Sequence, residues 1–223
     1  AGGGSIASVV GGRTFKVGPH SAGADPGPAC YGKGGTVPTV TDANLMLGRL
    51  SSSYALGGEI RIDAGRAQAV VSELAQSLGL SPEAMADGIL RLVNVTMASA
   101  IREISIQRGH DPREFALVAF GGAGPMHACD LARDLAIPQV VVPPAPGNLC
   151  AFGLLVTDVV AERSETLLAR TAGLDPARLA GRFERLAAAA IEDLRRDGIP
   201  REAIRVVCTA DMRYVGQKSE LPV

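Results

Sequence analysis

A short apolar run that leads directly into a glycine-rich turn sets the strongest constraint on the fold of this chain. Residues 115–120 (FALVAF) are continuously apolar, and residues 121–125 (GGAGP) follow at once. Such a run favours a strand buried on both faces, and a proline in the turn suits the first turn of a helix through Leu135. With a second short strand at 139–143, the segment predicts a strand–helix–strand unit with a right-handed crossover. The sequence therefore predicts an α/β fold.

Cap residues and apolar spacing predict the remaining elements. Asp63 and Ser81 are expected to cap two of the helices, and Thr41 or Asp42 a third. The predicted helices are residues 41–50, 64–78, 82–108, 148–156 and 176–196, and the further predicted strands are residues 5–10, 14–17 and 204–212. The composition changes after Ala161, so we expect domains at 1–160 and 161–223, and both ends suggest a fragment of a longer protein.

Composition argues against several classes of protein. The 223 residues include 22 Lys and Arg, 23 Asp and Glu and no Trp, for a formal net charge of −1 with no long block of either sign. This argues against nucleic-acid partners and a polybasic membrane anchor. The four cysteines form no C-x-x-C pair, which fits reduced thiols in the cytosol. Because no uninterrupted apolar run reaches 18 residues, we expect a cytoplasmic protein without a membrane segment.

The segment 27–34 (GPACYGKG) resembles a phosphate-binding P-loop at seven of eight positions. At the eighth, Gly34 lacks the hydroxyl that ligates Mg²⁺ in that motif. The preceding residues are small, polar and end in proline, which a buried central strand does not tolerate. Glycines and Pro38 downstream oppose a helix. The segment is therefore predicted to be an ordered loop and not a P-loop.

Two glycine clusters could present backbone N–H groups to a ligand. The first is Gly2-Gly3-Gly4-Ser5, for which the alternatives are a disordered tail or, through Ser5, a serine-hydrolase elbow that Ala7 leaves incomplete. The second is Gly121-Gly122-Ala123-Gly124, between the apolar strand and its helix. His127 stands where a dinucleotide fingerprint needs glycine, which leaves either a ligand-binding turn or tight strand–helix packing.

Four polar residues near these clusters are candidates for chemistry. His127 and Asp25 are candidate catalytic residues, although a lone histidine is more often structural. Asp42 and Asn44 are candidate ligands of Mg²⁺ bound together with phosphates. The alternative for both is helix capping.

Five blocks of sequence, in this order, resemble the hydantoinase A/5-oxoprolinase family. They are AGGGSIA, KVGPHSAGADPGPACYGKGGTVPTVTDANLMLGRL, AIREISIQRGHDPREFALVAFGGAGPMHACDLARDL, VVPPAPGNLCAFGLL and DMRYVGQ. The family is similar in fold to the acetate and sugar kinase/heat-shock ATPase/actin superfamily. The resemblance implies the second lobe of an actin-like ATPase fold, incomplete at both ends. It also implies nucleotide contacts at Gly2, Gly3, Gly4 and Ser5 (a phosphate loop) and at Gly121, Gly122, Ala123 and Gly124 (an adenosine turn).

The resemblance also implies a reaction and partners. ATP and Mg²⁺ would serve to phosphorylate and open a cyclic amide or imide, with a hydantoinase B-type subunit or domain as partner and a homo-oligomer as a possible assembly. The alternatives are a ketone carboxylase subunit and a nucleotide-binding assembly module without activity. The D-x-G-G-T phosphate loop of the superfamily is absent from this sequence. We therefore expect the 223-residue chain alone to show no Mg²⁺-dependent release of phosphate from ATP.

Overall fold

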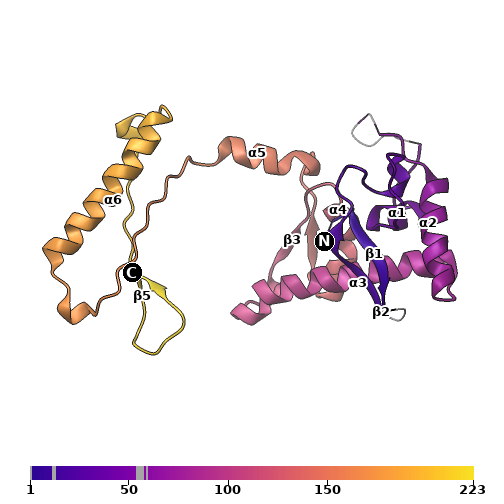
Figure 1. Ribbon diagram of the computed structural model, residues 1–223, viewed down its shortest axis with the longest axis horizontal. Coiled ribbons are helices and arrows are strands. Elements are labelled where there is room, and N and C mark those ends of the chain that lie inside the picture. Colours follow the sequence, from indigo (N-terminus) through magenta and orange to yellow (C-terminus); the bar gives the residue numbers. More distant parts are fainter. Residues whose placement is uncertain (1, 12–13, 54–57, 59) are drawn as a thin grey trace. The chain divides into compact units, whose positions relative to one another are not determined.

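The chain forms two compact units, Ala1–Leu155 and Val156–Val223, in a computed structural model that describes residues 2–11, 14–53, 58 and 60–223 (Figure 1). The domain limits expected from the sequence, 1–160 and 161–223, remain a prediction.

Helices and strands of the first unit follow the predicted order. They are β1 (Ser5–Val10), β2 (Thr14–Ser21), α1 (Val40–Met46), α2 (Ala64–Ser77), α3 (Pro82–Ile104), β3 (Ala116–Val118), α4 (Gly124–Asp134), β4 (Gln139–Val141) and α5 (Leu149–Val156). β1 and β2 pair antiparallel. β3 and β4 pair parallel, and α4 lies between them in the sequence. The strand–helix–strand unit and the N-terminal hairpin are therefore confirmed.

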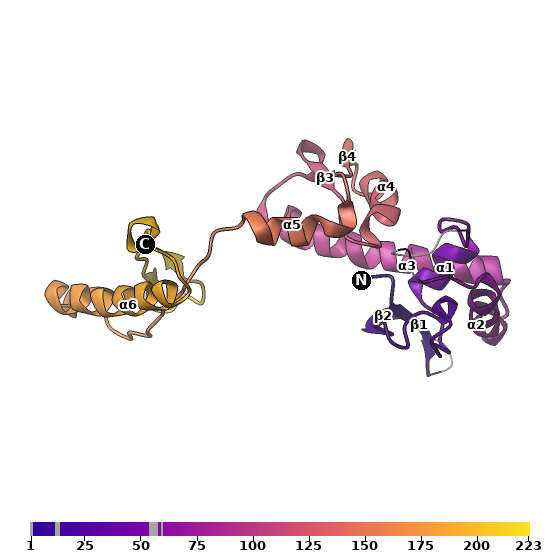
Figure 2. The ribbon, with the colours of Figure 1, turned by 90° about the horizontal axis from the view of Figure 1, so that it is seen from above.

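The long helix α3 runs lengthwise through the first unit and carries its core (Figure 2). The Ser81 hydroxyl accepts a hydrogen bond from the N–H of Ala84 at 3.1 Å, and Pro82 occupies the first turn, as predicted. α3 packs against α1, α2 and β2 along its N-terminal half. The buried cluster there comprises Ala7, Val40, Ala43, Val71, Ala75, Met85, Ala86, Ile89, Leu90 and Val93.

The segment Pro82–Arg108 contains an 18-residue stretch of mean hydropathy 1.3, which could cross a membrane by length and composition alone. The apolar face of α3 packs in the core of the first unit, so the stretch behaves here as a core helix. The α-helix ends at Ile104, four residues earlier than predicted, because a 3₁₀ turn (Ile106–Arg108) and Gly109 with a positive φ of 82° complete the segment.

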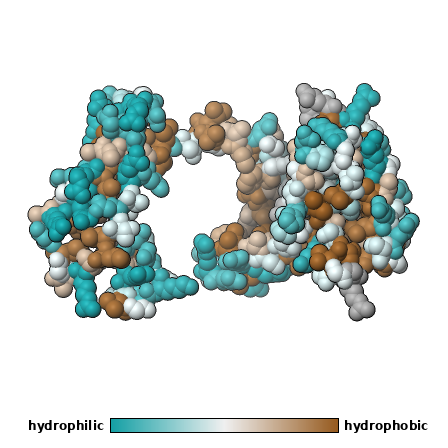
Figure 3. All heavy atoms as spheres, in the orientation of Figure 1, coloured by the Kyte–Doolittle hydropathy of each residue, from teal (hydrophilic) through white to brown (hydrophobic). Residues whose placement is uncertain are grey.

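The expectation that residues 115–120 form a strand buried on both faces is wrong for this structure. Only Ala116–Val118 form β3, and burial alternates along it. Leu117 packs against the cluster of Ala98, Leu131 and Leu135, which α3 and α4 contribute together with the residue after α4. Val118 and Phe120 are exposed. The β3–β4 sheet has two strands. Among the described residues, helices cover the face that carries Leu117, whereas the face with Val118 and Val141 is exposed. Hydrophobic residues are also exposed along α5 (Figure 3).

The second unit contains α6 (Pro176–Arg196), β5 (Asp211–Met212) and β6 (Leu221–Pro222). α6 has the predicted bounds, with Asp175 as its N-cap. The strand predicted at 204–212 is wrong for residues 204–209, which pair with no strand in the described chain, whereas Ala210 exchanges two backbone hydrogen bonds with Val223 and β5 follows it. Val206 and Val207 are exposed. Ion pairs of Arg163 with Asp193 and of Arg182 with Glu165 tie α6 to the segment that precedes it.

Truncation of a buried residue of α3 should destabilise the first unit strongly. Ile89 is fully buried in the core cluster, so Ile89→Ala should lower the free energy of unfolding by about 2–5 kcal/mol through lost burial and a residual cavity. The matched control is Val95→Ala on the exposed face of the same helix, which should change it by less than about 0.5 kcal/mol. Urea unfolding followed by circular dichroism measures both, and equal losses would contradict the core assignment.

Candidate functional site

The turn Gly2-Gly3-Gly4-Ser5 is ordered and rests on helix α1. The Ser5 N–H donates to the Gly2 carbonyl at 2.9 Å, and the Gly2 N–H donates to Ser5 Oγ at 3.1 Å. The Thr41 N–H donates to the Gly3 carbonyl at 2.9 Å. A Cβ on Gly3 would lie 2.5 Å from Thr41 Oγ1, so close packing against α1 requires glycine there. In the described part of the chain, the N–H groups of Gly3 and Gly4 have no hydrogen-bond partner.

The second turn, Gly121-Gly122-Ala123-Gly124, joins β3 to α4. The Gly121 N–H donates to the Pro146 carbonyl at 2.8 Å, and the positive φ of 83° at Gly121 explains glycine at that position. Ala123 is the N-cap residue of α4 and offers no side-chain acceptor. The N–H groups of Gly122, Ala123 and Gly124 therefore have no partner among the residues that the structure describes. Free N–H groups at a helix N-terminus attract anions.

Glycine at positions 122 and 124 has no steric cause in this structure. Both have φ outside the positive range, and a Cβ added to either would have no atom within 4 Å in its surroundings. This differs from Gly3, where α1 leaves no room, and from Gly4, where a Cβ would lie 2.8 Å from Ser21 Oγ. The absence of a packing reason favours the interpretation that this turn leaves space for a ligand against its backbone.

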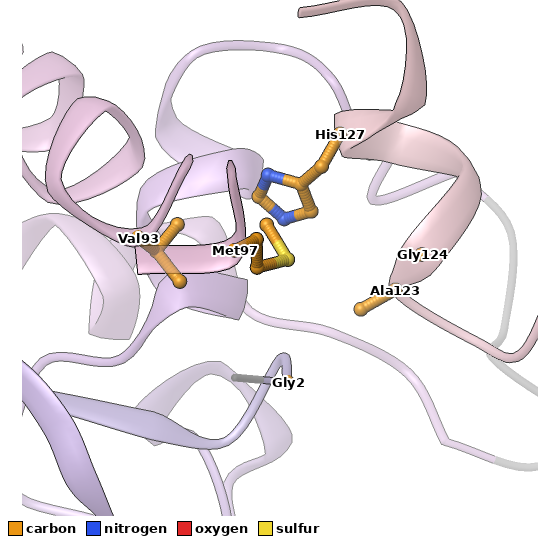
Figure 4. Close-up of a pocket in the computed structure, with 6 residues that line it drawn as sticks. All are labelled: Gly2, Val93, Met97, Ala123, Gly124 and His127. Atoms are coloured by element: carbon orange, nitrogen blue, oxygen red, sulfur yellow. The ribbon is translucent and has the colours of Figure 1, made fainter. Parts of the chain in front are cut away.

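The two turns meet at a small cavity (Figure 4). A Cβ on Gly3 would lie 3.7 Å from the Cβ of Ala123, although the turns are about 120 residues apart in the chain. The cavity has a volume of about 20 Å³ and is lined by Gly2, Val93, Met97, Ala123, Gly124 and His127. This volume holds roughly one water molecule. A phosphate group would therefore have to lie at the rim, where Gly2 and Gly122 are exposed.

His127 projects from α4 into this cavity and belongs to a polar network. Its ring is 2% exposed, and Nδ1 lies 2.8 Å from Asn94 Oδ1 on α3. Asn94 Nδ2 faces Asp130 Oδ2 at 3.5 Å. Arg49 donates to the same oxygen at 2.9 Å, and Arg133 to Oδ1 at 3.1 Å. His127 is thus connected through Asn94 and Asp130 to two arginines near the surface.

Burial and neighbouring charges shift the pKa values of both His127 and Asp130. Burial lowers the pKa of His127 from its ordinary value, and the Arg49 guanidinium lowers it further, while Asp130 acts in the opposite direction. Partial burial raises the pKa of Asp130, but hydrogen bonds and charge from Arg49 and Arg133 outweigh it and leave that pKa below its ordinary value. The arrangement therefore favours a neutral imidazole beside an ionised carboxylate.

Asp42, a candidate metal ligand, is fully buried and accepts four hydrogen bonds. Its donors are Thr39 Oγ1 at 2.7 Å and the N–H groups of Thr39 at 2.9 Å, Cys30 at 2.9 Å and Ala29 at 3.4 Å. Thr39, and not Thr41 or Asp42, is the N-cap of α1, and Asp42 completes a capping box from the third helical position. The cap prediction is thus corrected by two residues. These contacts favour the capping role of Asp42 over a metal-binding one.

Asn44 and Asp25 lie away from the cavity lining. The Asn44 amide donates to the Val40 carbonyl at 3.0 Å, and its Oδ1 is buried without a hydrogen-bond partner in the described part of the chain. Asp25 is exposed in the loop after β2, and no described contact links it to His127. Among the described residues, no three His, Cys, Asp or Glu side chains gather as a metal site.

The P-loop-like segment is an ordered loop and not a P-loop, as predicted, with residues 27–30 buried and residues 32–34 exposed. A 3₁₀ turn occupies Ala29–Tyr31, with no helix until α1, and Lys33 is exposed. Burial raises the pKa of the Cys30 thiol, and the neighbouring Asp42 carboxylate raises it further, so this cysteine is an inert core residue. Gly35 is required because a Cβ there would lie 2.3 Å from the Gly27 carbonyl oxygen.

Sequence reasoning missed the residues that hold His127. Arg49, Asn94 and Asp130 come from three separate segments, and only the tertiary fold brings them together. One signal was present in the sequence. Asn94 is a polar residue on the apolar stripe of α3, next to Val93 and three residues before Met97. A buried amide in such a stripe needs hydrogen-bonding partners from elsewhere in the fold.

These features define a mixed α/β protein in which two glycine turns present backbone N–H groups near a common point. A family model described as hydantoinase/oxoprolinase matches residues 1–163. The chain belongs to the hydantoinase/oxoprolinase family.

Two relatives illustrate the family. The chain is 44% identical over 228 residues to the caprolactamase subunit alpha of Pseudomonas jessenii, matching all of this chain and 33% of that protein. It is 34% identical over 237 residues to 5-oxoprolinase of Saccharomyces cerevisiae, matching all of this chain and 18% of that protein.

Solved structures agree with this assignment. The crystal structure of the ATP-dependent caprolactamase from Pseudomonas jessenii superposes with a TM-score of 0.72 at 42% identity, over the whole chain and 33% of the other. A nucleotide-free structure of acetone carboxylase gives a TM-score of 0.75 at 26% identity, over the whole chain and 33% of the other. The chain thus spans a third or less of the relatives that it matches.

Removal of the Asp42 carboxylate should destabilise the first unit much more than removal of an exposed helix cap. Asp42→Ala leaves four buried donors without their acceptor, at about 1–3 kcal/mol for each unsatisfied group. We expect a total loss of at least about 4 kcal/mol. The control is Asp63→Ala, which removes the exposed N-cap of α2 and should cost about 1 kcal/mol. Chemical denaturation compares the two variants, and similar losses would contradict the structural role of Asp42.

Proposed function

We propose that this chain is the nucleotide-holding part of an ATP-dependent hydrolase that phosphorylates and opens a cyclic amide or imide. One observation carries the proposal. The unpaired N–H groups of two turns gather where Gly3 approaches Ala123, and they come from Gly3, Gly4, Gly122, Ala123 and Gly124. Backbone N–H groups in this arrangement suit the oxygens of a polyphosphate. The ATP dependence of the related caprolactamase supports ATP as the nucleotide.

The two turns would divide the nucleotide between them. The Gly2–Ser5 turn would contact phosphate oxygens, and the turn before α4 would lie against the adenosine, with its helix N-terminus favouring negative charge nearby. The family resemblance implies this division, and an actin-like ATPase lobe would provide it. Because the shared cavity holds about one water molecule, the nucleotide would rest across its rim.

The proposed chemistry activates a poor electrophile. Transfer of the γ-phosphoryl group of ATP to the carbonyl oxygen of the ring yields ADP and an O-phosphorylated intermediate. Water would then add to the carbonyl carbon, and the ring C–N bond would break after the nitrogen gains a proton, which leaves an acyl phosphate. A second water molecule would hydrolyse the acyl phosphate to a carboxylate and inorganic phosphate. Positioning and preorganised donors would supply most of the rate acceleration.

The described residues show no clustered metal ligands, and the hydrogen bonds around Asp42 leave it poorly suited to bind a metal. We therefore assign Mg²⁺ no ligand in this chain and derive no step through it.

A second subunit or domain is part of the proposal. The related caprolactamase protein is named as a subunit, and the chain spans a third of its length. We propose a hydantoinase B-type partner and a cytoplasmic assembly.

The likeness to acetone carboxylase makes a ketone carboxylase subunit the alternative. ATP consumption by the full-length pair of subunits, measured against lactams, hydantoins and ketones, separates these functions. Consumption that depends on a ketone and bicarbonate would overturn the hydrolase assignment.

A negative side chain on the second turn should weaken nucleotide binding without affecting the fold. Gly122 has no positive φ and open space around its Cβ position, so Gly122→Glu fits the backbone but brings a carboxylate to the proposed site. We expect the affinity of the 223-residue chain for ATP to fall by at least about tenfold through charge repulsion. Isothermal titration calorimetry measures this affinity.

The matched control is Gly173→Glu, at another unstrained and open position in the second unit. It should bind ATP as the unmodified chain does. Equal affinities of the two variants, with unchanged melting temperatures, would contradict a nucleotide site at the turn before α4.

A further inference from the structure

The cavity between the two turns has a polar side chain with an unused nitrogen. His127 is 2% exposed, and its ring points toward Met97 in the cavity lining (Figure 4). Nδ1 is engaged with Asn94, but Nε2 has no hydrogen-bond partner among the described residues. His127 lines the cavity, so a molecule seated there would supply the hydrogen bond that the described residues do not give to Nε2. The N-terminus of α4, with its free N–H groups, borders the same cavity.

The network around His127 determines which nitrogen carries the proton. An ionised carboxylate only accepts hydrogen bonds, so Asp130 faces the amide NH₂ of Asn94. The amide oxygen of Asn94 is then the atom turned toward His127, at 2.8 Å from Nδ1. An oxygen acceptor at this distance requires a proton on Nδ1. Nε2 of a neutral ring is consequently a lone-pair acceptor.

The position of Asp130 is itself fixed by two cations. Arg49 approaches Oδ2 at 2.9 Å and Arg133 approaches Oδ1 at 3.1 Å. Arg49 follows α1, whereas Asp130 and Arg133 belong to α4, so the ion pair spans two segments of the first unit. Loss of this pair would free Asp130 and, with it, the orientation of the Asn94 amide.

We propose that His127 Nε2 accepts a hydrogen bond from a single hydroxyl-type donor seated in the cavity between the two glycine turns, and that Asn94, Asp130 and Arg49 are positioning residues for this contact. The donor is a water molecule or a sugar hydroxyl of the bound nucleotide. A free N–H of α4 can donate to the same oxygen, which would give it two partners.

Size and charge both exclude an anion at this point. About 20 Å³ accommodates one oxygen but no phosphate group. The lone pair of Nε2 repels anionic oxygens, and the charged groups that face the ring are Arg49 and Asp130, with opposing effects on its proton. The lowered pKa of His127 keeps the ring neutral near pH 7. The cavity therefore selects a neutral donor.

Nitrogen-15 NMR of the 223-residue chain tests the tautomer directly. In the unmodified chain near neutral pH, His127 should show a protonated Nδ1 and an unprotonated Nε2. Asn94→Leu should lose this preference, and Asp130→Asn, a partly exposed position, should weaken it. Asp134→Asn removes an exposed carboxylate of the same helix and should leave the spectrum unchanged. A charged ring or a protonated Nε2 in the unmodified chain would overturn the proposal.

A crystal structure of the chain without nucleotide tests the occupant. We expect an ordered oxygen within hydrogen-bond distance of Nε2, whereas an empty cavity would overturn the assignment of water. Titrations with ATP, 2′-deoxy-ATP and 3′-deoxy-ATP then separate the two sources. If a sugar hydroxyl is the donor, one deoxynucleotide should bind about 3- to 10-fold more weakly, and His127→Phe should remove that difference.

Equal binding of the three nucleotides would identify water as the donor where the crystal structure shows it, and would overturn the proposal where the cavity is empty. The sugar comparison rests on the proposed nucleotide function, but the NMR and crystallographic results do not. A chain that binds no nucleotide yet shows the expected tautomer and bound oxygen would contradict the nucleotide function alone.

Discussion

The buried carboxylate of Asp42 holds three parts of the first unit together. It accepts hydrogen bonds from the 3₁₀ turn that contains Cys30 and from Thr39, the N-cap residue of α1. The start of α1 in turn fixes the N-terminal turn, because the N–H of Thr41 binds the Gly3 carbonyl. The loop 27–34, which resembles a phosphate loop, therefore contributes to the site indirectly: it supports the helix on which the first glycine turn rests.

Elements with strong local signals could be predicted from the sequence. The start of α6 follows from Asp175 and Pro176, and the start of α3 from Ser81 and Pro82, because caps act within one turn of helix. Burial of β3 was predicted wrongly because apolar composition reports what a segment can bury and not what is present to cover it. The run 204–212 failed similarly, since a ladder needs a partner strand that local sequence does not specify.

The parts of the candidate site also differed in how far the sequence alone could predict them. The glycine turns were recognisable because their composition limits what the backbone can do, and His127 was recognisable by its place one turn into α4. The polar network of Asn94, Asp130 and Arg49 could not be recognised from the sequence, because its members come from α3, α4 and the segment after α1. The cap of α1 was misplaced for a related reason. Local sequence suits Thr39 and Thr41 equally well as the N-cap. With Thr39 as the cap, Asp42 accepts hydrogen bonds from the N–H groups of Ala29 and Cys30, which are distant in the sequence.

Close contact between Gly3 and Thr41 has a consequence for the thermodynamics of association. A triple glycine in a free chain samples many backbone conformations, and fixing each residue costs roughly 1–2 kcal/mol in entropy. Here the fold has already met this cost, since α1 leaves room for one path of the chain. A molecule that docks on this turn would meet a rigid surface, so its interaction energy would not be spent on ordering the three glycines.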